Sequence, residues 1–205
     1  MTYLLFGYLL VVLVPMFVAS WRTSLLGLAV QGLLLGWMAI ELTTDAGFTA
    51  TRIALLVELL LVRGVFVPAW LYRVLDDLKT PARNDIIPAN LLFWTIVGVL
   101  VVVAFRFANG VFADEQASTH LAVAAAALLL GLLVLATQNQ PVSQLIGVLR
   151  IENAIALFEL ASEPHVPLPV QLGMLGIFVG TVLTFAWFLR KLAGARADWV
   201  EGPAL

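Results

Sequence analysis

The sequence predicts an all-α protein, a polytopic membrane helical bundle of about seven transmembrane helices. Apolar residues make up 62% of the chain, whereas soluble domains are about half apolar. Charged residues make up only 12%, and most of them fall between long apolar runs. Several of these runs approach the roughly 20 residues that cross a bilayer core. Because lipid offers no hydrogen bonds to the backbone, each run is expected to be helical.

The apolar runs follow one another with short breaks that carry polar residues, Pro or Gly, such as Gln138-Asn139-Gln140-Pro141. The predicted spans are Tyr3–Ser20, Thr23–Leu42, Thr51–Tyr72, Ala89–Phe107, Thr119–Thr137, Gln144–Ala161 and Leu168–Leu192. The first run has no basic segment ahead of it and no clear cleavage site, so we interpret it as a retained helix rather than a signal peptide.

The whole chain, 1–205, is interpreted as one membrane domain. Within it we distinguish the first three helices and their following loop (1–88), helices four and five (89–137), the last two helices (138–192) and a short tail (193–205). Ser24-Leu25-Leu26-Gly27 opening helix two resembles Gln144-Leu145-Ile146-Gly147 opening helix six. This weak repeat favours two related three-helix units with helix four between them.

Basic residues in the short loops predict the orientation of the chain. One set of loops and the C-terminal tail carry seven of them, and the opposite set carries two. The seven are Arg22, Arg73, Lys79, Arg83, Arg190, Lys191 and Arg196, and the two are Arg52 and Arg106. The asymmetry predicts an N-terminus outside and a C-terminus in the cytoplasm.

The composition also argues against several kinds of functional site. The chain has no cysteine and only two isolated histidines, His120 and His165, so we expect no cofactor, haem or metal site. The formal net charge is −2 with no basic block, which makes nucleic acid an unlikely partner. No phosphate-binding loop and no nucleophile–base pair is visible. We therefore expect no catalytic residue and no enzymatic activity of the chain on its own.

Helix three carries two charges within its apolar run, Glu58 and Arg63. A charge at the bilayer centre costs on the order of 2.5–3.5 kcal/mol on insertion scales, so such residues usually face the protein interior. In an α-helix residues five apart point about 140° apart, so we expect each to meet a different neighbour rather than each other. Pro68, one turn further on, is expected to distort the helix.

Helix six carries Arg150, Glu152, Asn153 and Glu159. The two carboxylates are seven residues apart and therefore share one face of the helix. Asn153 shares a face with Arg150, three residues earlier. Such a column of carboxylates is what a proton relay needs, and the alternative is that Arg150 neutralises a carboxylate in a cluster that only holds helices together. The proton-path candidates are thus Glu152, Glu159, Glu58, Arg63, Arg150 and Asn153.

The last helix carries no buried carboxylate, but Gly176 and Gly180 have the spacing that permits close helix contact, and we expect them to pack.

The segment Gln138–Leu192 supports a family resemblance. A polar turn leads into a helix with Gly147 and Glu152-Asn153, and the last helix ends in Arg190-Lys191-Leu192. This arrangement resembles the hydrogenase-4 component E family, a membrane subunit of formate hydrogenlyase-type complexes, whose C-terminal helices are similar to the K-type subunit of respiratory complex I. Val62-Arg63-Gly64-Val65-Phe66-Val67-Pro68 looks like the family's stretch of a basic residue followed by proline.

The resemblance implies a non-catalytic subunit of a redox-driven, ion-translocating membrane arm. Its partners would be antiporter-like and other membrane subunits, the lipid bilayer of a bacterial or archaeal inner membrane and, indirectly, peripheral redox subunits. Glu152 matches the family's mid-helix glutamate. An ungapped match places Ile177 where the family has an acid in the last helix, so Glu159 is the candidate to replace that acid. Two alternatives stay open, namely a structural adaptor between antiporter-like subunits and a stand-alone small transporter.

Overall fold

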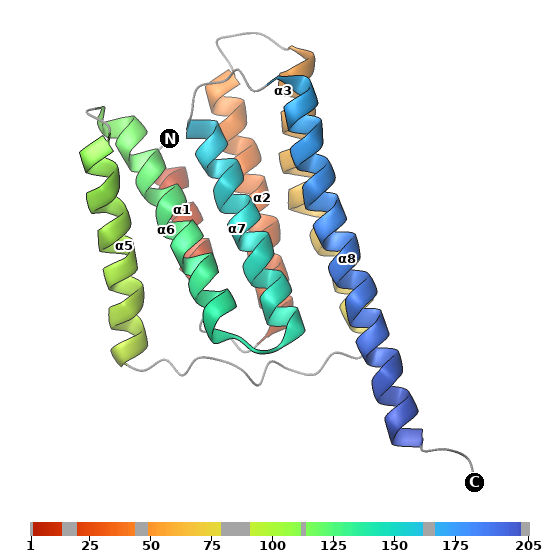
Figure 1. The fold of residues 1–205 in the computed structure, drawn as a ribbon. Helices are drawn as coiled ribbons and strands as arrows, with labels where there is room; N and C mark the ends of the chain where they lie inside the picture. Colours follow the sequence, from red (N-terminus) through yellow and green to blue (C-terminus); the bar gives the residue numbers. More distant parts are fainter. Residues whose placement is uncertain are drawn as a thin grey trace.

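The computed structural model describes residues 2–13, 20–43, 49–78, 91–111, 114–161 and 167–201, and every regular element in these ranges is a helix (Figure 1). The helices are α1 (Thr2–Leu13), α2 (Trp21–Thr43), α3 (Ala50–Leu56), the π-helix η2 (Val57–Phe66), α4 (Val67–Asp77), α5 (Leu91–Val111), α6 (Glu115–Thr137), α7 (Pro141–Ala161) and α8 (Leu168–Glu201). The predicted helical membrane bundle is confirmed.

Six of the described helices are long and apolar enough to cross a membrane. α3, η2 and α4 run on from one another and together form one of these six, Ala50–Asp77. α1 is apolar but shorter, and residues 14–19 of the first predicted span lie outside the described residues. At the other end, the helix that begins at Leu168 continues beyond the predicted span, so residues 193–201 of the expected tail extend α8.

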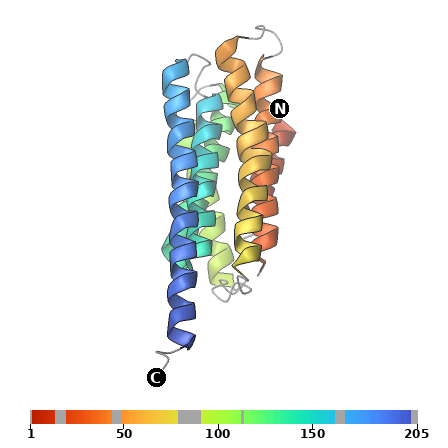
Figure 2. The same ribbon diagram turned by 90° about the vertical axis from the view of Figure 1, so that its right-hand side faces the viewer.

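The helices form two layers, best followed by comparing Figures 1 and 2. One layer holds α1, α2 and the α3–η2–α4 helix, and the other holds α6, α7 and α8, with α5 beside α6 (Figure 1). α1 packs on α6, α2 on α7, and the α3–η2–α4 helix on α8. The two helices of each pair run in the same direction (Figure 1). Two related three-helix units stay a prediction from the sequence.

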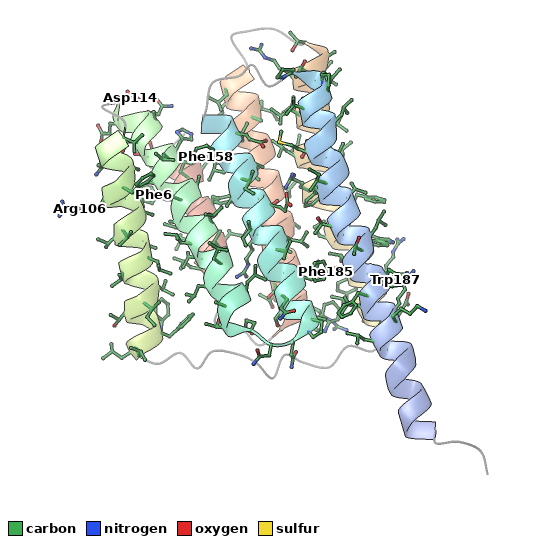
Figure 3. All side chains as sticks on the ribbon, in the orientation of Figure 1. Phe6, Arg106, Asp114, Phe158, Phe185 and Trp187 are labelled. Atoms are coloured by element: carbon green, nitrogen blue, oxygen red, sulfur yellow. The ribbon has the colours of Figure 1, made fainter. Side chains whose placement is uncertain are left out.

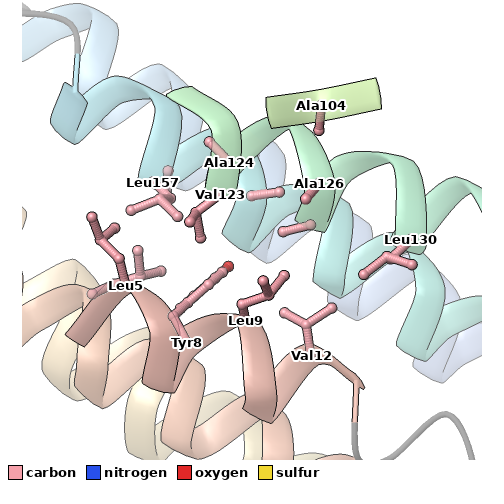
Figure 4. Packing of buried hydrophobic residues seen from close by; sticks show 14 of the residues in the cluster. Leu5, Tyr8, Leu9, Val12, Ala104, Val123, Ala124, Ala126, Leu130 and Leu157 are labelled. Atoms are coloured by element: carbon pink, nitrogen blue, oxygen red, sulfur yellow. The ribbon is translucent and has the colours of Figure 1, made fainter. Parts of the chain in front are cut away.

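Small side chains bring the two layers together. α6 is rich in buried alanines, including Ala124 and Ala126, which belong to the same buried cluster as Leu5, Tyr8 and Leu9 of α1. In the close view these α1 side chains point towards α6 (Figure 4). Because alanine adds so little bulk, α1 and α6 can approach closely, and this is a common means of packing helices in membranes, where apolar burial alone gives no preference for protein over lipid.

Two glycines make the contact between α2 and η2 closer still. A Cβ atom on Gly32 would lie 2.6 Å from the backbone nitrogen of Gly64. One turn further along α2, a Cβ on Gly36 would collide with the Leu60 side chain. Backbone therefore meets backbone at this crossing, and the residue next to Gly64 in the chain is Arg63.

The basic residues separate as predicted between the two ends of the bundle. Arg22 is near the start of α2, Arg73 near the end of α4 and Arg190 in the C-terminal half of α8. These parts of the three helices lie towards the end where α8 extends beyond the others, whereas the start of α3, with Arg52, and the last turns of α5, with Arg106, lie towards the opposite end (Figure 1). Figure 3 shows Arg106 projecting from α5 away from the other helices. Lys79 and Arg83 lie outside the described residues. Which end faces the cytoplasm stays a prediction from the charge asymmetry.

A buried polar cluster at the candidate functional site

The helix that runs from Ala50 to Asp77 changes from α to π geometry at its centre. Across Val57–Phe66 the backbone hydrogen bonds join residues five apart, and the Val67 N–H still bonds to the Val62 carbonyl. Pro68 follows directly, in the first turn of α4. Proline lacks an N–H and its ring collides with the carbonyl four residues earlier, so the wider turn ahead of it relieves that conflict. The distortion expected at Pro68 thus takes the form of a π-helix.

This geometry corrects the expectation that Glu58 and Arg63 point apart. The Nη2 atom of Arg63 lies 2.9 Å from Glu58 Oε1, and Arg63 Nε donates to the same oxygen at 3.0 Å. A π-helix has more residues per turn than an α-helix, so residues five apart lie much closer to one face of it, whereas the expectation assumed α-helical rotation. Both side chains are buried, with 4% and 6% of their surfaces exposed, so the pair is shielded from lipid.

Arg63 also joins three further helices. Its Nη1 donates to Asn153 Oδ1 of α7 at 3.4 Å, and Asn153 Nδ2 in turn donates to Gln31 Oε1 of α2 at 3.3 Å. The guanidinium carbon lies 4.0 Å from the ring centroid of Phe178 on α8, within cation–π range. We call Gln31, Glu58, Arg63 and Asn153 the polar cluster. It ties α2, η2 and α7 at the centre of the bundle.

The two candidate carboxylates of α7 lie at the edge of this cluster. Glu152 and Glu159 are both half-buried, and Glu152 directly precedes Asn153 of the cluster in the chain. Their neighbours Ile155 and Phe158 on α7 are exposed. The carboxylates therefore stand on one side of α7, where the interior face gives way to the outer face, as their seven-residue spacing predicts.

Arg150 is the only basic residue of α7 and is deeply buried, with 2% of its surface exposed. Of the six sequence-predicted residues, Glu58, Arg63 and Asn153 are joined by direct contacts. Arg150, Glu152 and Glu159 lie on the same helix as Asn153.

Sequence reasoning missed Gln31, Tyr8 and Phe178. Gln31 could have been found, because it is a polar residue within the long apolar run of α2, the same signal that identified Glu152. Tyr8 and Phe178 carry no such signal, since aromatic residues are common in membrane helices. The Tyr8 hydroxyl and the Gln31 amide nitrogen are buried and make no hydrogen bond to any residue that the structure describes.

The last helix differs from the sequence expectation. A Cβ on Gly173, Gly176 or Gly180 would meet no atom within 4 Å, so the expected packing of Gly176 and Gly180 is not found among the described residues. Ile177, at the position of the acid that the resemblance implies, is 65% exposed. α8 instead contacts α3 through the buried Gln171, whose amide, in one of its two orientations, accepts from Leu55 N at 2.7 Å and donates to Thr51 O at 3.1 Å.

No group of three or more acidic or histidine side chains that could hold a metal ion occurs in the described part of the chain. His165 and Glu163 lie outside it. Comparison with protein-family models, with curated proteins and with solved structures found no match. The chain is thus characterised by its own geometry, a membrane-spanning helical bundle with a polar cluster at its centre.

Proposed function

We propose that this chain is a non-catalytic membrane subunit of an energy-converting complex, similar to hydrogenase-4 or complex I assemblies, and that its buried carboxylates take part in moving protons or cations. The observation that carries the proposal is the position of Glu152 near the middle of α7, half-buried at the margin of the polar cluster. A carboxylate at this depth is unfavourable against lipid. Its exposed part is therefore expected to face a partner subunit or a water path.

The polar cluster supplies what a proton path needs beside such a carboxylate. Glu58 and Arg63 provide fixed charges, and Asn153 and Gln31 extend hydrogen bonds from η2 to α7 and α2. The buried Tyr8 hydroxyl adds a group with hydrogen-bonding capacity. Water molecules bridging such groups would connect Glu152 and Glu159 along the membrane normal.

The outer helices favour a subunit over a stand-alone transporter. Only 22% of the membrane-spanning stretch of α8, and the same share of that of α5, is buried within the chain, against 61% for α7. α8 thus packs lightly against the rest of the chain, and Glu152 and Glu159 of α7 keep part of their surface exposed. A larger assembly would cover these faces and complete the surroundings of Glu152.

The structural-adaptor alternative rests on a different observation, the internal pairing of Arg63. Because Glu58 already compensates Arg63 within the same helix, the cluster can hold α2, η2 and α7 in place as a purely structural contact. The two functions differ in what the loss of a proton-carrying group does. Glutamine keeps the shape and hydrogen bonds of Glu152 but cannot carry a proton.

The test uses the purified complex in liposomes, with proton movement followed by a pH-sensitive dye. Glu152→Gln should assemble with unchanged subunit stoichiometry while proton translocation falls several-fold, and Glu159→Gln should fall less. The matched control is Glu115→Gln, an exposed carboxylate in the first turn of α6. If Glu152→Gln pumps like the parent complex, the adaptor function replaces the relay. If the native chain copurifies with no other membrane subunit, the subunit proposal itself is wrong.

A further inference from the structure

An apolar groove opens between α2 and α4 at the arginine-rich end of the bundle. It has a volume of about 580 Å³ and is walled by Leu25, Leu26, Ala29, Pro68 and Ala69. The groove is separate from the polar cluster, which lies deeper in the bundle. Its apolar walls exclude a small soluble anion as the main occupant, because such an ion would lose its hydration there without compensation.

The mouth of the groove is polar and cationic. Arg22, Tyr72 and Arg73 line it together. The Arg22 guanidinium lies 5.2 Å from the centroid of the Trp21 ring and 5.7 Å from that of Tyr72, so two aromatic faces hold it at the mouth. Tryptophan and tyrosine are enriched where helices leave the hydrocarbon core, which places this mouth at headgroup level.

The charges around the mouth leave it receptive to an anion. Arg22 Nη2 lies 3.0 Å from Asp76 Oδ1, an exposed ion pair that water and an incoming anion can reach. Arg73 adds a second positive charge, and Asp77 at the end of α4 is a further exposed carboxylate. An anion bound at the mouth would thus meet two guanidiniums, with Asp76 as its direct competitor for Arg22.

The groove runs from headgroup level into the hydrocarbon layer. Arg22 and Ala29 are seven residues apart on α2, a rise of about 10 Å. Arg73 and Ala69 are four apart on α4, so the same polarity gradient runs along both walls. A ligand that fits this gradient is anionic at one end and a long aliphatic chain at the other.

We propose that this groove binds an anionic phospholipid from the leaflet at the arginine-rich end, with the phosphate between Arg22 and Arg73 and an acyl chain along Ala29 and Ala69. Arginine suits this role because its planar donors match phosphate oxygens. Basic pockets between membrane helices recognise lipid headgroups in the same way. Each guanidinium near the membrane surface strengthens the binding of an anionic lipid severalfold.

Native mass spectrometry of the full chain, released from detergent, tests the proposal with two lipids. Dioleoylphosphatidylglycerol should be retained more tightly than dioleoylphosphatidylcholine, since only the first is anionic. The variant Arg22→Gln/Arg73→Gln should lose about ten- to thirtyfold in affinity for dioleoylphosphatidylglycerol. Arg52→Gln/Arg106→Gln, which removes two arginines from the opposite end, is the matched control and should keep the affinity of the parent. Equal losses in the two double variants, or no preference between the lipids, would overturn the site.

A second variant keeps the test decisive if the arginine variant fails to fold. Ala69→Phe fills the exposed apolar wall without changing any charge, and Ala136→Phe makes the same change at an exposed position of α6. Weaker retention of dioleoylphosphatidylglycerol in Ala69→Phe alone supports the groove as its site. Parent-like retention in both variants contradicts it. Asp76→Asn should have the opposite effect on lipid affinity. Because it removes the competitor for Arg22, it should tighten binding of the anionic lipid.

Discussion

α2 and α8 each carry two glycines four residues apart, yet the two pairs have opposite surroundings. Gly32 and Gly36 of α2 face η2 so closely that a methyl group on either would collide with it. Gly176 and Gly180 of α8 face open space. The same small-residue spacing therefore marks an internal helix crossing in one layer and an outer face in the other. Spacing shows that a close approach is possible, and the rest of the fold decides whether the chain itself makes it.

The internal crossing explains why the polar cluster sits where it does. At Gly32 the backbones of α2 and η2 meet beside Arg63. That approach brings Gln31, the residue preceding Gly32, towards the bundle centre, where it accepts from Asn153. Glycine at this point is thus a condition for the polar contacts around Arg63, and not only for packing.

The largest expected effect tests the contrast between the two glycine pairs by placing a large side chain at one glycine of each pair. Gly32→Leu should destabilise the chain by at least the upper end of the about 1–3 kcal/mol typical of overpacking, because the clash is with backbone that cannot rotate away. Gly176→Leu should leave the stability of the isolated chain within about 0.5 kcal/mol of the parent. Thermal unfolding in detergent, followed by intrinsic fluorescence of the six tryptophans, measures both.

Gly176→Leu also tests whether the outer face of α8 contacts a partner helix. In the isolated chain, a large loss of stability in this variant would show that α8 packs through its glycines after all. In cells, reduced recovery of associated membrane subunits with Gly176→Leu, at normal levels of the chain, would place a partner helix on this face. Ile177→Ala, the neighbouring exposed position, is the companion variant, because it removes bulk instead of adding it.

The second prediction extends the comparison to charges, because the buried pair beside Gly64 should behave unlike any surface pair. Glu58→Ala should cost about 3–5 kcal/mol, since it leaves the Arg63 charge uncompensated in the bundle interior. Glu58→Ala/Arg63→Met should recover much of that loss, because it removes the charge as well as its partner. Unfolding by increasing sodium dodecyl sulfate in mixed micelles gives the free energies. A double variant that is no more stable than Glu58→Ala would contradict a coupled pair.

Much of the fold could be predicted from the sequence because the bilayer limits the choices. Runs of apolar residues separated by polar breaks predicted most helix ends to within about five residues, as at Gln138-Asn139-Gln140-Pro141, where a turn connects α6 to the Pro141 start of α7. The exception at the C-terminal end is α8, which runs nine residues beyond the predicted Leu192. The interior position of Glu58 and Arg63 was also predicted, because a charged side chain is costly against lipid.

The details of the site could not be predicted, for a physical reason that Glu58 and Arg63 illustrate. Their pairing depends on the rotation per residue of the backbone between them, and apolar periodicity does not distinguish π from α geometry over ten residues. Pro68 signals a distortion but not its form. Gly176 shows the same limit, because which of two equally spaced glycine pairs finds a neighbour is decided by the packing of all the helices together.

The smallest expected effect concerns the exposed ion pair between Arg22 and Asp76. Their contact of 3.0 Å is nearly as short as that of Arg63 with Glu58, but about half of each side chain is exposed. Water screens the two charges and solvates either one when its partner is lost, so such a pair contributes at most about 1 kcal/mol. Asp76→Asn should therefore change the unfolding free energy by less than about 1 kcal/mol in the same micelles, and 1 M salt should abolish the difference.

Arg22 also stacks near Trp21 and Tyr72, and these contacts stay intact in the variant. A loss as large as that of Glu58→Ala would mean that burial is not what separates the two pairs, and the contrast between the interior crossing and the outer faces would have to rest on packing alone.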